Sequence, residues 1–189
     1  TEDWRLFGRR DGNFRFASVD EFTYTSPDQE LKTQTGVSYE LGAEWLQPGY
    51  RAKAMLYRIN LENEIAFDPS ATPPAGVLWP GANVNFDPTT HQGVIIEGDH
   101  MLSSNFRVGA AYTYTNATFD SGIYAGNTIS GVPRDSFKIM TDYYFAGSWH
   151  WFFEGNYTGR QYLSGDNDNA LGLQPGYTVI NTAVDYTWK

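Results

Sequence analysis

Apolar and polar residues alternate along much of this chain, most clearly over residues 35–45. Every second side chain of this stretch is apolar or aromatic: Val37, Tyr39, Leu41, Ala43 and Trp45. The positions between them are small, polar or acidic: Ser38, Glu40, Gly42 and Glu44. Because successive side chains of a β-strand point to opposite sides, the pattern predicts a strand over about residues 34–46 with one apolar and one polar face.

Similar alternation predicts further strands along the rest of the chain. A long strand is expected over about 50–66, and its outward face is expected to carry Arg51, Lys53, Met55, Tyr57, Ile59, Leu61 and Ile65. Another is expected over about 83–101, interrupted near Asp87-Pro88. Later alternating segments begin near Phe106, Phe137, Trp149 and Ile180. Near the N-terminus, short extended segments at 4–7 and 13–17 flank Arg9-Arg10-Asp11-Gly12.

The connections between these strands alternate between short and long. Short turns are expected at 47–49, 102–105 and 146–148, and longer irregular segments at 18–33, 67–82, 118–132 and 163–176. No run of apolar residues has convincing helical spacing. The rhythm predicts an all-β fold, an antiparallel up-and-down meander whose apolar side faces lipid and whose polar side faces water. In outer-membrane barrels of this kind the short turns are periplasmic.

Composition supports a membrane barrel without requiring one. Aromatic residues make up 16% of the 189 residues, yet no apolar run approaches the ~18 residues of a membrane helix. Aromatic residues gather near strand ends, where barrels carry aromatic girdles: Trp45, Tyr50, Trp149, Trp151 and Trp188. The net charge of -9 argues against a nucleic-acid partner, and the absence of cysteine excludes disulfides and thiolate metal sites. A soluble β-sandwich would show the same alternation and stays open.

Candidate chemistry is sparse, and we expect neither an enzyme nor a cofactor. His91, His100 and His150 lack metal-ligand spacing and are expected on different strands. Glu40, Glu44, Asp142 and Glu154 could form acid–base pairs, but a polar inner face needs such charges anyway. Asp166 and Asp168 are weak calcium candidates, because the residues after them depart from the EF-hand pattern.

Several segments resemble the C-terminal part of TonB-dependent outer-membrane receptors. Residues 13–21 (Asn-Phe-Arg-Phe-Ala-Ser-Val-Asp-Glu) are similar to the family's "FR-x-(P/A)-(T/S)-x-x-E" stretch, and 31–42 to its "L-K-P-E-x-S-x-x-Y-E-x-G" signature. Thr33 and Gln34 stand in place of the usual Pro and Glu, and Ile95 replaces the Glu of "x-G-V-E" at 92–95. Further similar segments follow in the family's order at 57–65, 112–117, 131–134, 162–169 and 175–180.

This resemblance implies a fragment of a large transmembrane β-barrel of about 22 strands. Residues 1–189 would then form about a third of the wall, without the plug domain and the last strands. The implied protein sits in the outer membrane of a Gram-negative bacterium and imports a scarce nutrient, most simply a ferric siderophore, with energy delivered by the TonB complex through the plug. Its partners would be outer-membrane lipid, the rest of the barrel, the plug, TonB and the small ligand.

Ligand contacts are expected on the long loops. Trp79, Tyr124 and Tyr162 are aromatic loop residues of the kind that anchor ligands, but loop packing or contact with the membrane surface would also explain them. Arg15 could meet an anionic ligand or could equally pair with Asp11, Asp20 or Glu21. Two other functions stay open. The chain could be a complete eight-stranded outer-membrane barrel acting as adhesin, anchor or pore, or a soluble β-sandwich that binds carbohydrate.

Overall fold

A computed structural model describes residues 3–27 and 29–188 of the chain. One short helix, α1, covers Val19–Thr23. The strands are β1 (Trp4–Arg15), β2 (Gln34–Gln47), β3 (Tyr50–Glu62), β4 (Ile65–Asp68), β5 (Ala82–Asn85), β6 (Thr89–Ser103), β7 (Phe106–Phe119), β8 (Asp135–Phe145), β9 (Trp149–Thr158), β10 (Gln161–Tyr162), β11 (Leu173–Gln174) and β12 (Tyr177–Tyr186).

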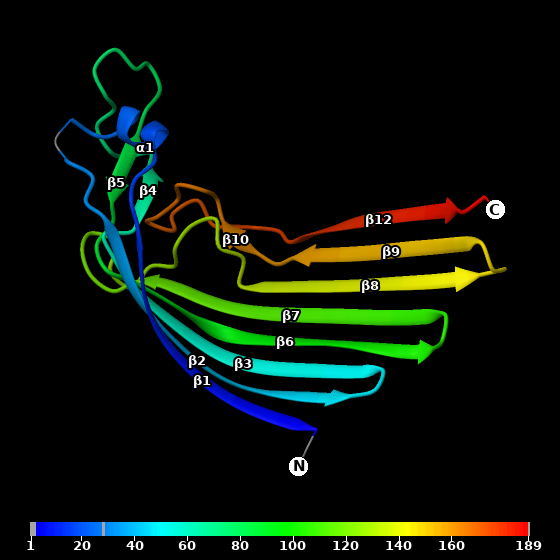
Figure 1. Ribbon diagram of the computed structural model, residues 1–189. Coiled ribbons are helices and arrows are strands. Elements are labelled where there is room, and N and C mark those ends of the chain that lie inside the picture. The colour runs from blue at the N-terminus through cyan, green and yellow to red at the C-terminus, as the bar shows by residue number, and fades with distance from the viewer. Residues whose placement is uncertain (1–2, 28, 189) are drawn as a thin grey trace.

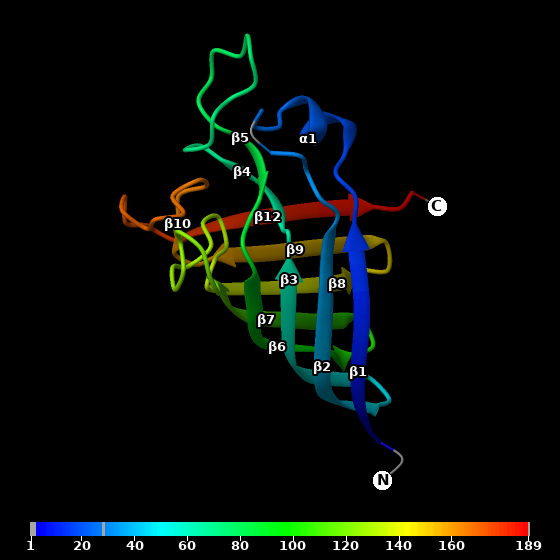
Figure 2. The same ribbon diagram turned by 90° about the vertical axis from the view of Figure 1, so that its left-hand side faces the viewer.

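Eight strands form one antiparallel sheet in the order β1-β2-β3-β6-β7-β8-β9-β12. The sheet bends like part of a cylinder wall, and α1 and the β4-β5 pair stand beyond one end of it (Figure 1). Strong twist makes β1–β3 cross β8–β12 in projection (Figure 2). Within the described residues, β1 pairs with β2 alone and β12 with β9 alone, so the wall is open. The predicted all-β meander is confirmed, and neither a closed eight-stranded barrel nor a sandwich of two large sheets is formed.

The apolar face predicted from residues 35–45 continues across the sheet. Strand register puts Leu41 opposite Leu56, and Leu56 opposite Val94. These side chains stay open to the surroundings: Leu41 is 64% and Leu56 55% exposed. Large apolar side chains are normally buried, so a whole face of exposed ones indicates contact with lipid. We call this face the outward face and the opposite one the inner face.

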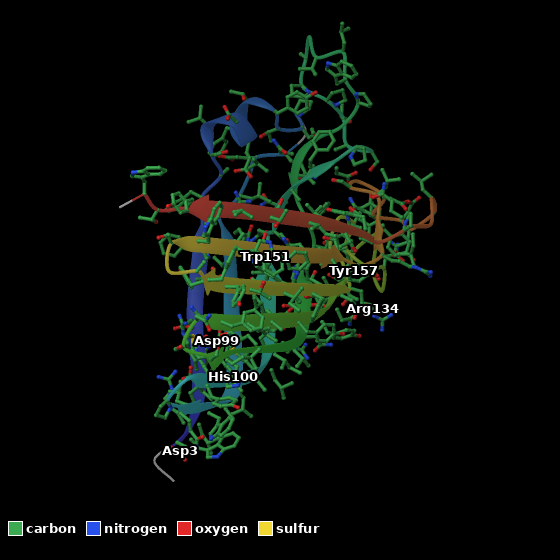
Figure 3. All side chains as sticks on the ribbon, turned by 90° about the vertical axis from the view of Figure 1, so that its right-hand side faces the viewer. Asp3, Asp99, His100, Arg134, Trp151 and Tyr157 are labelled. Atoms are coloured by element: carbon green, nitrogen blue, oxygen red, sulfur yellow. The ribbon has the colours of Figure 1, made fainter. Side chains whose placement is uncertain are left out.

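The short turns between β2 and β3, β6 and β7, and β8 and β9 lie at one end of the sheet, which we call the short-turn end; the opposite end is the long-connection end. An aromatic band crosses the outward face at the short-turn end. Its rings follow one another from strand to strand, from Trp4–Trp45 (6.3 Å between centroids) and Trp45–Tyr50 (5.9 Å) to Phe145–Trp149 (6.2 Å) and Trp149–Tyr186 (4.8 Å). Figure 3 shows Trp151 and Tyr157 towards opposite ends of β9 on this face. The band is the girdle expected where a barrel wall meets one membrane interface.

Two predictions about the first strands are wrong. Residues 4–15 form one strand, because Arg9-Arg10-Asp11-Gly12 pairs in unbroken register with residues 37–40 of β2. In β3 the predicted face is inverted: Lys53 lies opposite Glu44 and Tyr57 opposite Glu40, so both lie on the inner face. The outward positions of β3 are Ala52, Ala54, Leu56, Arg58 and Asn60, which pair with Trp45, Ala43, Leu41, Tyr39 and Val37.

Three of the long connections contain structure that periodicity did not predict. Helix α1 in segment 18–33 begins with a capping box, in which Ser18 and Glu21 satisfy each other's backbone N–H groups. Segment 67–82 is bounded by the β4-β5 pair, and β10 pairs with β11 around segment 163–172. A one-turn helix and strands of two or four residues are too short to leave a clear periodic signal. Within residues 3–27 and 29–188, no helix is long and apolar enough to cross a membrane.

Candidate functional site

The inner face of the wall carries a ladder of ion pairs between neighbouring strands. Glu44 lies at its centre and accepts from Arg5 of β1 (Nη2–Oε2 2.8 Å) and Arg51 of β3 (Nε–Oε1 2.9 Å). Arg51 and Lys53 also approach Glu97 of β6, each at 3.6 Å. The Glu44 side chain is nearly covered, with 5% exposed, because these cations lie over it. The carboxylate is therefore neutralised within the wall.

The ladder continues across the later strands. Arg107 donates to Asp99 at 2.7 Å, and Lys138 lies 2.5 Å from Glu154. His150 stands between two carboxylates, Asp142 at 3.0 Å and Asp185 at 3.3 Å. Gly109 has no side chain and Ala111 only a methyl group, and a hollow of about 220 Å³ lies over them among these charges. Such a wall presents balanced polar groups to whatever fills the lumen, as barrel interiors do.

The acidic residues considered for acid–base work do not form a pair in the described structure. Glu40 and Glu44 are four positions apart on β2, about 13 Å along the strand. Glu154 pairs with Lys138, and Asp142 contacts His150. These carboxylates are thus parts of the ion-pair ladder.

The three histidines do not form a cluster either. His91 and His100 both lie on β6, not on different strands as predicted, and register places them on opposite faces. His91 contacts Glu64 at the long-connection end, whereas His100 stacks on Tyr50 with ring centroids 3.5 Å apart. His150 lies on β9. Among the residues that the structure describes, no three His, Cys, Asp or Glu side chains are arranged to hold a metal ion.

The long-connection end has a small core of its own, formed by Val84, Phe86, Ala117, Phe119 and Ile129. Tyr124, a predicted ligand contact, packs against this core with its ring 5.3 Å from that of Phe119. Its hydroxyl donates to Asp68 at 3.1 Å, and burial together with the Asp68 charge raises the pKa of Tyr124. Tyr124 therefore stays a neutral donor that fastens its loop to the β4-β5 pair.

Arg15, the predicted anion contact, is already paired. Its Nη1 donates to both carboxylate oxygens of Glu21, at 2.8 and 2.9 Å, and its Nη2 donates to the Ile65 carbonyl at 2.9 Å. The backbone N–H of Ser18, with Arg15, lowers the pKa of Glu21. Arg15 thus links β1, α1 and the start of β4.

The two other aromatic candidates lie in different places. Trp79 is 76% exposed in the connection between β4 and β5, beside Leu78, which is 97% exposed. Tyr162 is half-buried in β10, and its backbone carbonyl accepts from Gly131. In the described part of the chain, no hydrogen bond or ring contact joins any two of Arg15, Trp79, Tyr124 and Tyr162.

The calcium candidates belong to a loop that is held by its own hydrogen bonds. The Asp166 carboxylate accepts from the backbone N–H groups of Ala170 (2.9 Å) and Leu171 (3.1 Å) and is buried, with 4% exposed. Neighbouring Asn167 and Asn169 join this loop to Thr128 and Ser130 of the preceding one. The geometry explains Asp166 as a residue that stabilises the loop and gives no support to a calcium site.

One partly buried polar cluster was not predicted. Glu64 accepts from Thr89 (2.6 Å) and contacts His91 Nε2 (3.3 Å) where β3, β4 and β6 meet. Burial raises its pKa, but the hydrogen bonds from His91 and Thr89 outweigh burial, so the pKa of Glu64 lies below its usual value. The only signal in the sequence was an acidic residue in a predicted strand; the neighbouring Asn63 adopts a positive φ of 55° between β3 and β4.

Comparison with known proteins gives a consistent family. The family model described as TonB dependent receptor-like, beta-barrel matches residues 1–189. The ferrichrome outer membrane transporter/phage receptor of Escherichia coli K12 is 30% identical over 159 residues, which cover 80% of this chain and 20% of that protein. The iron-regulated outer membrane virulence protein of Vibrio cholerae is 24% identical over 174 residues, covering 86% of this chain and 26% of that protein.

Solved structures show the same fold. The ferric yersiniabactin uptake receptor FyuA from Yersinia pestis superposes with a TM-score of 0.73 at 16% identity, over 98% of this chain and 28% of that one. The siderophore receptor PiuA from Acinetobacter baumannii gives a TM-score of 0.74 at 16% identity, over 100% and 28% of the two chains. The chain thus spans between 20% and 26% of the length of the curated relatives described above.

Proposed function

Because this chain belongs to the TonB-dependent receptor-like β-barrel family, we propose that it is part of the wall of a receptor that imports a ferric siderophore. Members of this family are proteins of the Gram-negative outer membrane, and that is where the chain is located. The proposal extends to the whole protein: a plug domain and further strands complete the barrel, and TonB supplies energy through the plug.

The observation that carries this proposal is the contrast between the two faces of one open sheet. The outward face combines exposed apolar residues with an aromatic band, whereas the inner face carries the paired charges around Glu44. Small residues on the inner face, such as Gly109 and Ala111, suit a lumen that holds a separate domain. A small closed barrel would fill its lumen with its own side chains.

The iron chelate is proposed from the names of the relatives together with the loops. The matched proteins are described as a ferrichrome transporter, an iron-regulated outer membrane virulence protein and a ferric yersiniabactin uptake receptor. Loops at the long-connection end are joined by hydrogen bonds such as Ser130–Asn167 and Thr128–Asn169, so they form a preorganised surface. A preorganised surface loses less entropy when it binds a ligand.

The experiment is growth of a strain that lacks the full-length gene on a panel of ferric siderophores under iron limitation. We expect growth to fail on one ferric chelate and to return when the gene is supplied again, while growth on freely diffusing ferrous iron is unchanged. Normal growth of the deletion strain on every chelate, with no chelate bound by the purified receptor, would contradict the proposal.

Trp79 is the ligand contact we propose from the four candidates, because Arg15 and Tyr124 are engaged in structural contacts and Tyr162 is half-buried. Replacement of an exposed aromatic anchor by alanine commonly costs about 2 kcal/mol of binding energy. Trp79→Ala should therefore weaken chelate binding by roughly thirtyfold. Its neighbour Leu78, which is 97% exposed, provides the matched control: Leu78→Ala should bind as the unchanged receptor does.

A further inference from the structure

The outward face of the sheet carries few charges, and all of them lie towards the long-connection end. Register puts four Arg, Asp or Glu residues of the main strands on this face: Arg10, Arg58, Glu62 and Asp135. An arginine at the bilayer midplane of a barrel costs about 2–4 kcal/mol, falling to about 0–1 near the interface. Charges on a lipid-facing surface therefore need a partner or a place among the headgroups.

Two of these arginines flank one tyrosine on adjacent strands. Arg10 of β1 lies opposite Tyr39 of β2, and Tyr39 lies opposite Arg58 of β3. These strands lie side by side in Figure 2. Strands are about 4.8 Å apart, so the two arginine Cα atoms are about 10 Å from each other. The Arg10 guanidinium lies 5.7 Å from the centre of the Tyr39 ring.

Neither arginine forms an ion pair with a carboxylate in the described part of the chain. Arg58 donates through Nε to the Asn60 side chain at 3.0 Å, and Arg10 rests over the Tyr39 ring. The contrast with the inner face is sharp, since Arg9, next to Arg10, pairs with Asp11. Each guanidinium has five N–H donors, so both residues keep donors free for an anion.

Arg10, Tyr39 and Arg58 form a row across β1, β2 and β3 that lies just beyond the apolar part of the outward face. Two positions towards the short turns, the outward residues are Leu41 and Leu56, paired with each other. Long arginine side chains at this level extend towards the headgroups. Long loops are extracellular in barrels of this type, so the nearer headgroups are those of the outer leaflet.

We propose that Arg10, Tyr39 and Arg58 form a lipid-facing site for the phosphate group of an anionic lipid in the outer leaflet. Guanidinium groups bind phosphate through paired N–H···O bonds, and two of them about 10 Å apart can hold one phosphorylated headgroup between them. The tyrosine ring lies under the Arg10 guanidinium, 5.7 Å from its centre, and supports it. The site depends on the outer-membrane location and not on the nutrient that the receptor transports.

The test is native mass spectrometry of the full-length receptor in neutral detergent, titrated with bisphosphorylated lipid A. The double variant Arg10→Gln/Arg58→Gln should bind it about tenfold or more weakly, since each basic residue near an anionic membrane surface contributes to attraction. Arg9→Gln is the matched control for Arg10→Gln, because it removes the same charge from the inner face of the same strand. Heat-dependent migration on gels shows that each variant is folded.

Two further measurements distinguish binding of a lipid phosphate from binding of free phosphate. Dephosphorylated lipid A should bind all variants alike, and inorganic phosphate at millimolar concentration should not displace the lipid. The proposal is overturned if the double variant binds lipid A as the unchanged receptor does, if Arg9→Gln weakens binding equally, or if free phosphate competes fully. If the double variant does not fold, Arg10→Lys/Arg58→Lys replaces it. This variant keeps both charges but lacks the planar guanidinium groups that form paired N–H···O bonds, so lipid A binding should weaken to an intermediate extent. Unchanged binding by the lysine variant would overturn the proposal.

Discussion

Tyr124 holds its loop through its hydroxyl as well as through its ring. The hydroxyl donates to Asp68, whose side chain is buried and also accepts from Ser70. Tyr124→Phe keeps the ring against Phe119 and removes the hydroxyl, which bonds Ser70 at 3.0 Å as well as Asp68, for a net loss of about 1 kcal/mol. We expect amide hydrogen exchange in residues 125–127 to become roughly fivefold faster in the full-length receptor.

The matched control for this prediction is Tyr162→Phe. The Tyr162 hydroxyl forms no hydrogen bond within residues 3–27 and 29–188. Amide exchange in residues 125–127 should therefore be the same in Tyr162→Phe as in the unchanged receptor. Equal exchange in Tyr124→Phe and the unchanged receptor would show that the ring alone fastens the loop.

Glu64 makes the β3–β4 junction sensitive to acid. Its pKa is lowered in the folded state, so its stabilising contribution is full above about 4.5, its ordinary value, and is lost as the pH falls through the folded pKa. Exchange protection factors for Phe86, whose N–H donates to the Glu64 carbonyl, should therefore hold from neutrality to about pH 4.5 and decline below it. In Glu64→Gln the decline should be absent, and an identical decline in both proteins would rule out Glu64 as its cause.

Residue roles at the long-connection end could be predicted only in part. An aromatic residue in a loop can bind a ligand or fill a small core, and the sequence does not distinguish the two for Tyr124 and Trp79. For Arg15 the sequence left open an anionic ligand or a nearby carboxylate, and the one-turn helix brings Glu21 to it. These roles depend on contacts between segments far apart in the chain, which strand alternation does not encode.

At the scale of the strands, Gly93 allows β3, β6 and β7 to come together. Tyr57 of β3 passes over Gly93 and bonds Thr115 of β7 at 2.8 Å. A Cβ at position 93 would lie 1.9 Å from the Tyr114 carbonyl oxygen, a backbone atom that cannot rotate away. Gly93→Ala should therefore destabilise the full-length receptor by about 1–3 kcal/mol, seen as a lower temperature of the heat-induced gel shift.

Gly109 provides the comparison on the same face. A Cβ there would meet the flexible Met140 side chain at 3.4 Å and the Asp99 Cβ at an ordinary 3.7 Å, so Gly109→Ala should unfold at nearly the unchanged temperature. Equal effects of both substitutions would show that loss of glycine flexibility, and not the close approach to Tyr114, sets the cost.

Strand β2 could be predicted because its two faces differ in every residue from Val37 to Trp45. Strand β1 was divided in error, since Arg9-Arg10-Asp11-Gly12 has the composition of a turn although it pairs with β2 throughout. The face of β3 was inverted because its inner side carries Met55, Tyr57 and Ile59, which are as apolar as outward residues. Register against Glu40 and Glu44 decides the face, and register is a property of two strands.

At the scale of the whole molecule, the two edges of the wall decide whether these residues can fold alone. In lipid each unpaired backbone N–H or C=O costs several kcal/mol, and an eight-stranded open sheet exposes a row of them along β1 and another along β12. The paired charges of the inner face add a second requirement, since they need a polar lumen on that side. Residues 1–189 expressed alone and refolded in detergent or lipid should therefore give no heat-resistant, protease-resistant species.

The competing outcome is closure of the sheet upon itself by pairing of β1 with β12. The chain has no cysteine, so one introduced on each edge reports this directly: Gly8→Cys with Ile180→Cys should form no intramolecular disulfide if the edges stay apart. A rapid disulfide in a compact monomer would mean that eight strands suffice and that the inner face lines the lumen of a small closed barrel. We expect instead that protease resistance appears only when the rest of the receptor is present, because only further strands can pair with both edges at once.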